Sequence, residues 1–235
     1  MCAADRQPPA KGGGVKTAGV LFDVDGTLVD TNYLHVLAWW QAFRTQGHDV
    51  SMTRLHRTVG QGSDRFVTSI LGRDDEKVRA AHSDFYGPWK HRLLAFDGAA
   101  ELLRTTHKAG LAVVLATSAS ADEAEHLTAA IDADDAIDVI TNSDDVDTSK
   151  PDPDIVATAL EKAGLDAANA VFVGDTVWDV EAAGRAGLPC VGVLSGGISA
   201  DELRDAGAVA IYRDVRHLLE DFDSSPLARL TNSRR

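Results

Sequence analysis

The second half of the chain alternates short apolar segments with segments that carry the signals of helix starts and ends. The apolar segments lie at 111–116, 139–141, 171–173, 191–194 and 209–212. They are short enough to be buried strands, and buried strands separated by helices favour a parallel sheet covered on both faces. The pattern therefore predicts an α/β fold with a doubly wound parallel sheet.

Capping residues and glycines mark the expected helices between these strands. Ser120 and Ser199 are each followed three residues later by glutamate, which is the pattern of a capping box. Asp152 and Pro153 are expected to be the N-cap and first residue of a helix that ends before Gly164. Further helices are expected at 176–186 and 215–221.

One long segment interrupts the alternation. Residues 20–22 are expected to form a strand of the same sheet, yet the alternation resumes only near Gly98. The residues between have helical spacing at 33–46, 63–71 and 75–94. We therefore expect an all-helical cap at 32–96, inserted into a core made of 17–31 and 97–225, with hinges at 30–31 and 97–98. Residues 1–16 and 226–235 are expected to be flexible tails.

Composition excludes several classes of partner. The 235 residues carry a formal net charge of −13, which argues against a nucleic-acid or anionic-membrane surface. No segment has the roughly 18–20 apolar residues of a membrane span. The two cysteines, Cys2 and Cys190, do not form a disulfide framework and suit a reducing compartment. We expect a cytoplasmic protein, monomeric or weakly dimeric.

Polar residues gather where the predicted strands end, and parallel strands bring their carboxyl ends to one edge of the sheet. The residues expected at this edge are Asp23, Asp25, Thr117, Ser118, Lys150, Asp175 and Asp179. Clustered carboxylates without a histidine or cysteine partner favour a hard cation, and magnesium suits a site completed by phosphate oxygens. Lys150 and the metal can offset phosphoryl charge despite the acidic chain, while Thr117 and nearby backbone N–H groups bind the remaining oxygens.

This set of groups predicts phosphoryl transfer. One carboxylate can attack phosphorus to form an aspartyl-phosphate. A second, two residues further on, can protonate the leaving oxygen and later activate water. That role requires a raised pKa, which burial or neighbouring carboxylates would provide.

The motifs resemble those of the haloacid dehalogenase (HAD) superfamily, in its phosphatase branch with a small helical cap, related to phosphoglycolate phosphatase and β-phosphoglucomutase. The matching segments, in chain order, are Asp23–Leu28, Leu115–Ser118, Ser149–Pro151 and Gly174-Asp175 with Asp179. The likeness covers about Thr17 to Asp221.

The resemblance implies a Rossmann-like core and a role for each residue. Asp23 would be the nucleophile and Asp25 the acid/base. Magnesium would be bound by the Asp23 carboxylate, the Asp25 carbonyl oxygen and the Asp175 carboxylate, with Asp179 supporting. Thr117, Ser118 and Lys150 would bind phosphate. Because the dehalogenases of the superfamily lack an acid/base aspartate at the position of Asp25, this residue favours phosphate chemistry.

Some residues also have simple structural interpretations. Asp179 could begin a helix, Thr31 is expected to cap the first cap helix, and His35 near the hinge is more often a packed side chain. Trp39 is expected in the cap core. The glycine-bracketed turn at 59–65 is expected to face the active site, with Gln61 and Arg65 selecting the substrate.

Three functions follow from these residues. The leading hypothesis is a magnesium-dependent phosphatase acting on a small phosphorylated metabolite, such as a sugar phosphate or phosphoglycolate. The second is a phosphomutase of the β-phosphoglucomutase type, although Gly174 stands where those mutases carry an extra acidic residue. The third is a signalling receiver domain, which would need neither the cap nor Asp25.

Overall fold

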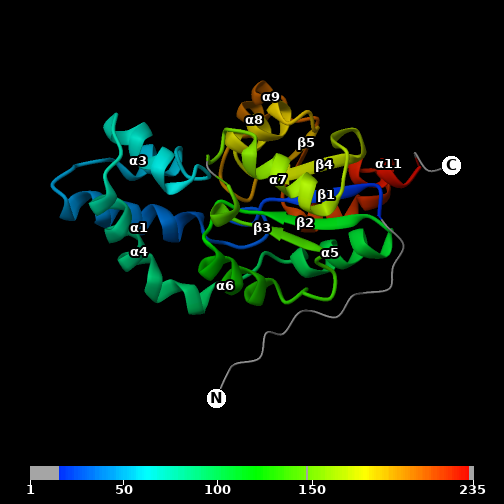
Figure 1. The fold of residues 1–235 in the computed structure, drawn as a ribbon, viewed down its shortest axis with the longest axis horizontal. Helices are drawn as coiled ribbons and strands as arrows, with labels where there is room; N and C mark the ends of the chain where they lie inside the picture. The colour runs from blue at the N-terminus through cyan, green and yellow to red at the C-terminus, as the bar shows by residue number, and fades with distance from the viewer. Residues whose placement is uncertain (1–15, 147, 233–235) are drawn as a thin grey trace, which may run out of the picture.

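The structure, a computed structural model, describes residues 16–146 and 148–232. Within these residues, six parallel strands form one sheet in the order β3-β2-β1-β4-β5-β6 (Figure 1). The strands are β1 (Gly19–Phe22), β2 (Ala112–Ala116), β3 (Val139–Thr141), β4 (Ala170–Gly174), β5 (Cys190–Val193) and β6 (Ala210–Tyr212). The predicted α/β fold with a parallel sheet is confirmed.

The strands read as continuous apolar runs because helices cover both faces of the sheet. Successive side chains point to opposite faces, so Val20 and Phe22 belong to one buried cluster and Leu21 to the other. The first face packs against α5 (Ala99–Lys108), α6 (Ala121–Ile131), α10 (Val215–Glu220) and α11 (Pro226–Asn232). The second packs against α7 (Asp154–Ala163), α8 (Val177–Arg185) and α9 (Ala200–Ala206).

The predicted helical cap is confirmed as an insert between β1 and α5, lying beside the sheet on the left of Figure 1. Its elements are α1 (Asn32–Thr45), α2 (Met52–His56), α3 (Ser63–Leu71), α4 (Glu76–Tyr86) and the 3₁₀ helix η1 (Gly87–Arg92). Trp39, Phe43 and Phe66 lie in a buried cluster of the insert that is separate from the two clusters of the sheet. The insert therefore has an apolar core of its own.

Two chain segments connect the insert to the sheet, and they lie side by side. Val29 and Ala95 form an antiparallel bridge. The Asp30 N–H donates to the Leu94 carbonyl oxygen at 2.9 Å, and the Phe96 N–H donates to the Leu28 carbonyl oxygen at 2.9 Å. The connections thus form a short paired ladder rather than two independent loops.

The expected single helix at 75–94 was wrong, because the α-helix ends at Tyr86 and a 3₁₀ helix follows. Gly87 and Pro88 explain the break. Glycine is a poor helix former, and proline removes an N–H donor and crowds the residue before it.

The expected C-terminal tail was also wrong over 226–232, which form α11 with Leu227 and Ala228 buried against the sheet. The signal was a start motif: the Ser225 hydroxyl accepts the Leu227 N–H at 3.2 Å, and Pro226 occupies the first helical position. Residues 233–235 and most of the expected N-terminal tail lie outside the described residues. Lys16, within that expected tail, bonds to Asp138 at 2.7 Å.

Two helix starts differ from expectation. Asp152 is not the N-cap of α7, which begins at Asp154 after Pro153; the Asp152 carboxylate instead pairs with arginine side chains. At α6, the Ser120 hydroxyl accepts the Glu123 N–H at 3.4 Å, but the reciprocal bond from the Glu123 side chain is absent among the described contacts. Across the described chain, every helix is too short or too polar to cross a membrane.

Candidate active site

The turn after β1 presents Asp23 and Asp25 at the edge of the sheet. The Asp23 N–H continues the ladder by donating to the Val173 carbonyl oxygen at 2.9 Å. The chain then reverses at Gly26, whose φ of +80° is in the left-handed region. A side chain at this position would also meet Asn32 Nδ2 at 2.3 Å and Asp175 Oδ2 at 2.5 Å. Glycine is required here because both the conformation and the space exclude a Cβ atom.

Four buried charged side chains converge below this turn, and we call them the acidic floor: Asp23, Lys150, Asp175 and Asp179. The Lys150 ammonium lies 2.5 Å from Asp23 Oδ1 and 2.8 Å from Asp179 Oδ1. One carboxylate oxygen from each of the three aspartates lies within 4.8 Å of the others. The structure therefore brings together residues that follow three separate strands, β1, β3 and β4, at the edge that the sequence predicted.

The acidic floor holds more negative than positive charge in a buried place. Burial raises the pKa of Asp23 well above its ordinary value, although Lys150 opposes this shift. Burial also raises the pKa of Asp175 to about 7, and the charge of Asp179 adds to the effect. The pKa of Lys150 is raised because the charges of Asp179 and Asp23 outweigh the effect of burial. A lysine therefore stays charged while two carboxylates resist ionisation.

Asp175 is held by neutral donors on both oxygens. Thr27 donates its hydroxyl to Oδ1 at 2.9 Å, and Asn32 donates its amide to Oδ2 at 2.9 Å. The Gly196 backbone covers the carboxylate so closely that a Cβ there would lie 1.6 Å from Oδ2. Asn32 is the first residue of α1, so the insert contributes to this end of the floor.

Asp179 has two contacts at once. Its Oδ2 accepts the Thr176 N–H at 3.0 Å and the Thr176 hydroxyl at 2.7 Å, completing a capping box at the start of α8. Its Oδ1 faces Lys150. The structural interpretation is therefore confirmed, and the second oxygen places Asp179 in contact with the floor; its support of a metal stays a prediction.

Asp25 lies above the floor, among hydrogen-bond donors. Thr31 donates to its Oδ1 at 2.7 Å, Thr117 donates to its Oδ2 at 3.1 Å, and His35 Nε2 lies 3.5 Å from Oδ1. Thr31 thus binds Asp25, whereas its expected side-chain cap to α1 is not formed. Burial favours a raised pKa, but His35 and the two hydroxyls outweigh it, so the pKa of Asp25 is lowered. The expected raised pKa is therefore wrong for the protein without bound phosphate.

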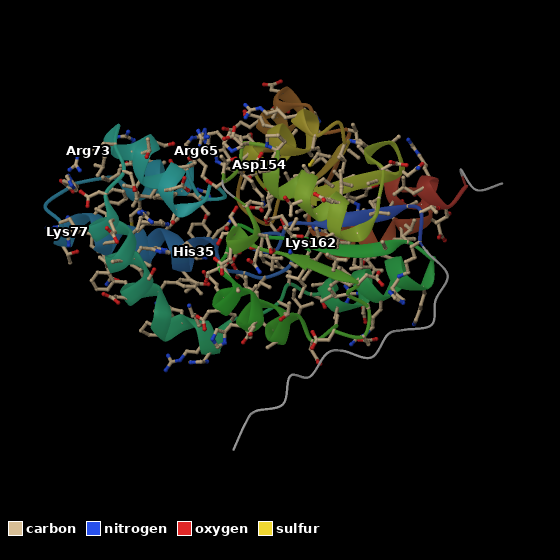
Figure 2. All side chains as sticks on the ribbon, viewed as in Figure 1. His35, Arg65, Arg73, Lys77, Asp154 and Lys162 are labelled. Atoms are coloured by element: carbon tan, nitrogen blue, oxygen red, sulfur yellow. The ribbon has the colours of Figure 1, made fainter. Side chains whose placement is uncertain are left out.

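A cavity of about 210 Å³, which we call the central pocket, opens onto Asp23 and Asp25. Its lining comes from α1, α3, α4, the turn before α3 and the loops after β2 and β3. Ser118 lines it, whereas Thr117 and Lys150 are buried and do not. His35, labelled in Figure 2, lies at the part of α1 nearest the sheet. The pocket thus lies between the insert and the strand ends.

The glycine-bracketed turn meets the core, but its two proposed selecting residues lie differently. Gln61 lines the central pocket, and its Oε1 accepts the Ser69 hydroxyl at 2.9 Å. Arg65 does not line it; its guanidinium pairs with Asp152, on the side of the insert that faces α7 (Figure 2). Arg65 therefore joins the insert to the core in this structure.

Sequence reasoning missed several residues of the site. Glu123 appeared only as the last position of a capping pattern, yet its carboxylate faces His35 at 3.6 Å. Tyr86 and His82 line the pocket from α4. Asn32 was not singled out. Only the structure shows that the Glu123 side chain does not complete the capping box with Ser120. His35, four residues after the expected hinge, was the one sequence signal that pointed to this part of the site.

Comparison with known proteins agrees with this geometry. The family described as haloacid dehalogenase-like hydrolase matches residues 20–193. Validoxylamine A 7'-phosphate phosphatase from Streptomyces hygroscopicus subsp. limoneus is 30% identical over 180 residues, covering 74% of this chain and 84% of that protein. A phosphoglycolate phosphatase from Rhodospirillum rubrum is 29% identical over 221 residues, covering 85% and 88%.

A solved structure extends the similarity to the fold. The crystal structure of a hydrolase from Pseudomonas syringae aligns with a TM-score of 0.83 at 35% identity, covering 88% of this chain and 99% of that one. The predicted resemblance is thereby confirmed in both sequence and architecture. The chain belongs to the haloacid dehalogenase-like hydrolases, as an enzyme of their phosphatase branch.

Proposed function

We propose that this phosphatase hydrolyses the phosphate ester of a small metabolite through an aspartyl-phosphate on Asp23, with magnesium as its cofactor. The observation that carries the proposal is the position of Asp23. Its carboxylate is held at 2.5 Å by Lys150 on the buried side, and the same residue lines the central pocket on the other. A nucleophile anchored by a cation and open to a substrate pocket suits phosphoryl transfer.

The acidic floor fits a divalent cation. Three buried carboxylates share one lysine, and the raised pKa values of Asp23 and Asp175 show that their ionised forms lack compensating charge. The Asp23 and Asp175 carboxylates and the Asp25 carbonyl oxygen would hold magnesium, with Asp179 supporting. When bound, the ion offsets the charge of the phosphoryl oxygens.

Asp23 attacks phosphorus, and the bond from phosphorus to the ester oxygen breaks. Asp25 gives a proton to that oxygen as the alcohol leaves. In the second half, Asp25 takes a proton from water, whose oxygen displaces Asp23 from phosphorus and releases phosphate. The lowered pKa of Asp25 describes the protein without substrate. A phosphate dianion beside Asp25 would raise this pKa by like-charge repulsion, which favours the protonated acid.

Thr117, Ser118 and Lys150 would position the phosphoryl group. The Thr117 hydroxyl accepts the Ala119 N–H at 3.0 Å, so the backbone after β2 curls around this point. Ser118 reaches the pocket lining. Lys150 is charged and fixed between Asp23 and Asp179, so it supplies positive charge without reorganisation.

Gly174 supports hydrolysis over the mutase alternative. A Cβ at this position would lie 2.5 Å from Asp179 Cβ and 2.6 Å from Asp179 Cγ. An acidic side chain here would displace Asp179 and with it the lysine of the floor. We infer that water, not a second sugar hydroxyl, accepts the phosphoryl group. Membership of the hydrolase family also removes the receiver-domain hypothesis.

The test is phosphate release from p-nitrophenyl phosphate and a panel of phosphorylated metabolites, with magnesium and with EDTA. Turnover should require magnesium and should be lost in Asp23→Asn. Acid quenching during turnover should leave a phosphate adduct on the peptide that contains Asp23, detected by mass spectrometry. Full turnover by Asp23→Asn would disprove the mechanism.

A further inference from the structure

The central pocket carries information on the leaving group, and the inference below rests on the proposed function. The pocket is small, about 210 Å³, and its walls reach from Asp25 to the helices of the insert. Whatever alcohol leaves from phosphorus must lie in this space. The side chains that surround Asp25 therefore indicate which chemical class of alcohol the pocket accepts.

One wall of the pocket is aromatic and rigid. The Trp39 ring stacks on Phe66 with centroids 4.4 Å apart and on His82 at 3.8 Å, and His35 stacks on Tyr86 at 4.0 Å. Trp39 is buried in the insert as expected, and it also lines the pocket. Aromatic rings favour contact with the C–H groups of a carbon skeleton over a compact charged group.

The cations that line the pocket are already paired. His35 lies between Asp25 at 3.5 Å and Glu123 at 3.6 Å. Lys90 pairs at 2.7 Å with Asp122. Burial and the charge of His35 hold the pKa of His82 well below its ordinary value, so this ring stays neutral. Among the described residues, the pocket thus has no uncommitted cation for a second anionic group.

Two polar atoms of the pocket are buried and lack good partners. The Tyr86 hydroxyl and the Glu123 carboxylate interact with each other, and Glu123 Oε1 also faces His35 at 3.6 Å, but neither atom makes a hydrogen bond of good geometry within the described residues. Tyr86 is only 1% exposed. Leaving such groups unsatisfied costs about 1–3 kcal/mol each. A donor and an acceptor side by side match the hydroxyl groups of a substrate.

We propose that the central pocket binds the phosphate ester of an uncharged, hydroxyl-rich alcohol such as a sugar or cyclitol, and that Glu123 and Tyr86 bind its hydroxyls. Glu123 also excludes leaving groups that carry a carboxylate, because two carboxylates would face each other with no free cation between them. Phosphorylated hydroxy acids, including phosphoglycolate, are therefore poor substrates for this chain. The aromatic wall packs against the carbon skeleton.

A matched pair of substrates tests how a carboxylate on the leaving group affects turnover. Glycerol 1-phosphate and 3-phosphoglycerate have the same carbon chain, with a hydroxymethyl group in one where the other has a carboxylate. The wild-type enzyme with magnesium should show a kcat/KM for glycerol 1-phosphate at least about tenfold higher, which corresponds to about 1.4 kcal/mol. Equal or faster turnover of 3-phosphoglycerate would overturn the proposal.

Variants of Glu123 and Tyr86 test whether these residues cause the substrate preference. Glu123→Gln removes the charge at nearly constant shape and should reduce the preference at least about fivefold, mainly by improving 3-phosphoglycerate. Glu125→Gln, an exposed glutamate on the same helix, is the matched control and should keep the preference. Tyr86→Phe should raise KM for glycerol 1-phosphate more than it lowers kcat, while the unliganded protein stays at least as stable as the wild type, because the lost hydroxyl had no good partner.

The outcomes separate this inference from the proposed function. Turnover of p-nitrophenyl phosphate that depends on Asp23 supports the proposed function whatever the preference. If that turnover is present but Glu123→Gln keeps the wild-type preference, the pocket assignment fails alone. If no phosphate ester is hydrolysed, the proposed function fails and the inference falls with it.

Discussion

The acidic floor and the central pocket meet at Asp23 and Asp25 but are built differently. The floor is a buried ionic cluster on strand ends, with Lys150 only 1% exposed. The pocket is lined by aromatic rings and by neutral and charged polar groups, most of them from helices of the insert, with Glu123 from α6. The floor is fixed by backbone geometry, whereas the pocket depends on how the insert sits over the sheet. The difference indicates that the floor carries out phosphoryl transfer, whereas the pocket selects the substrate.

The largest effect should come from the point where the two regions meet. Asp23→Asn removes the nucleophile, and kcat should fall by about 10⁴-fold or more. Because the change also removes a buried negative charge, thermal unfolding should show an equal or higher Tm. A circular dichroism melt provides the control for folding, and retention of more than a tenth of the wild-type kcat would show that Asp23 is not the nucleophile.

The floor should be sensitive to a single methyl group. Gly196→Ala places a Cβ 1.6 Å from Asp175 Oδ2 and should displace that carboxylate. We expect magnesium affinity to weaken by about tenfold or more, measured as the magnesium dependence of Tm and of activity. Gly184→Ala is the matched control, since nothing lies within 4 Å of its Cβ. It should leave magnesium affinity unchanged and, in helix α8, stabilise the protein by up to about 1 kcal/mol.

The charge imbalance of the floor should appear as a pH dependence of stability. Burial and Asp179 raise the pKa of Asp175 from 3.8 to about 7, so between these values the folded state binds a proton that the unfolded state has released. Raising the pH through this range therefore favours unfolding. In EDTA, the wild type should lose on the order of 2 kcal/mol relative to Asp175→Asn between pH 4 and about 7.

Urea denaturation of both proteins across this range gives the measurement. Magnesium should flatten the wild-type dependence, because the cation favours the ionised carboxylate. A constant difference between wild type and variant at every pH would show that Asp175 titrates normally.

The smallest effect on stability and activity is expected for the ion pair between Arg65 and Asp152, outside both the floor and the pocket. Arg65 and Asp152 form a partly exposed ion pair between insert and core, so Arg65→Ala should cost less than about 1 kcal/mol in stability. Since Arg65 does not line the pocket, kcat/KM should change by less than about threefold. A larger loss for one substrate only would return Arg65 to the selecting role that the sequence suggested.

The two regions also differ in how far the sequence predicts them. The floor could be predicted because Asp23 and Asp175 directly follow strands, Lys150 lies in the loop after another strand, and parallel topology brings these strand ends together. Glu123 and Tyr86 carry no such mark, because helix positions alone do not say which face meets another domain. Glu123 matched a capping box, and only the packing of His35 against it shows that its side chain turns inward.

Local backbone signals also had limits. Proline at 153 indicated a helix start but not which neighbour would cap it, and Asp152 found arginine partners instead. The Ser225–Pro226 start was overlooked because the helix after it is short and only three of its residues, Leu227, Ala228 and Leu230, are apolar. Lowering of the Asp25 pKa could not be foreseen, since it depends on His35 from the insert and Thr117 from the sheet.

The paired connection between insert and sheet has a mechanical consequence. Two adjacent chains joined at Val29 and Ala95 behave as a strap, not as two separate tethers. A strap bends readily, but twisting or sliding would break the bonds between Asp30 and Leu94 and between Phe96 and Leu28. Bending about the strap is therefore the motion that we expect of the insert. Such a motion would bring its helices back over Asp23 in the same alignment, without a search for the correct orientation between turnovers.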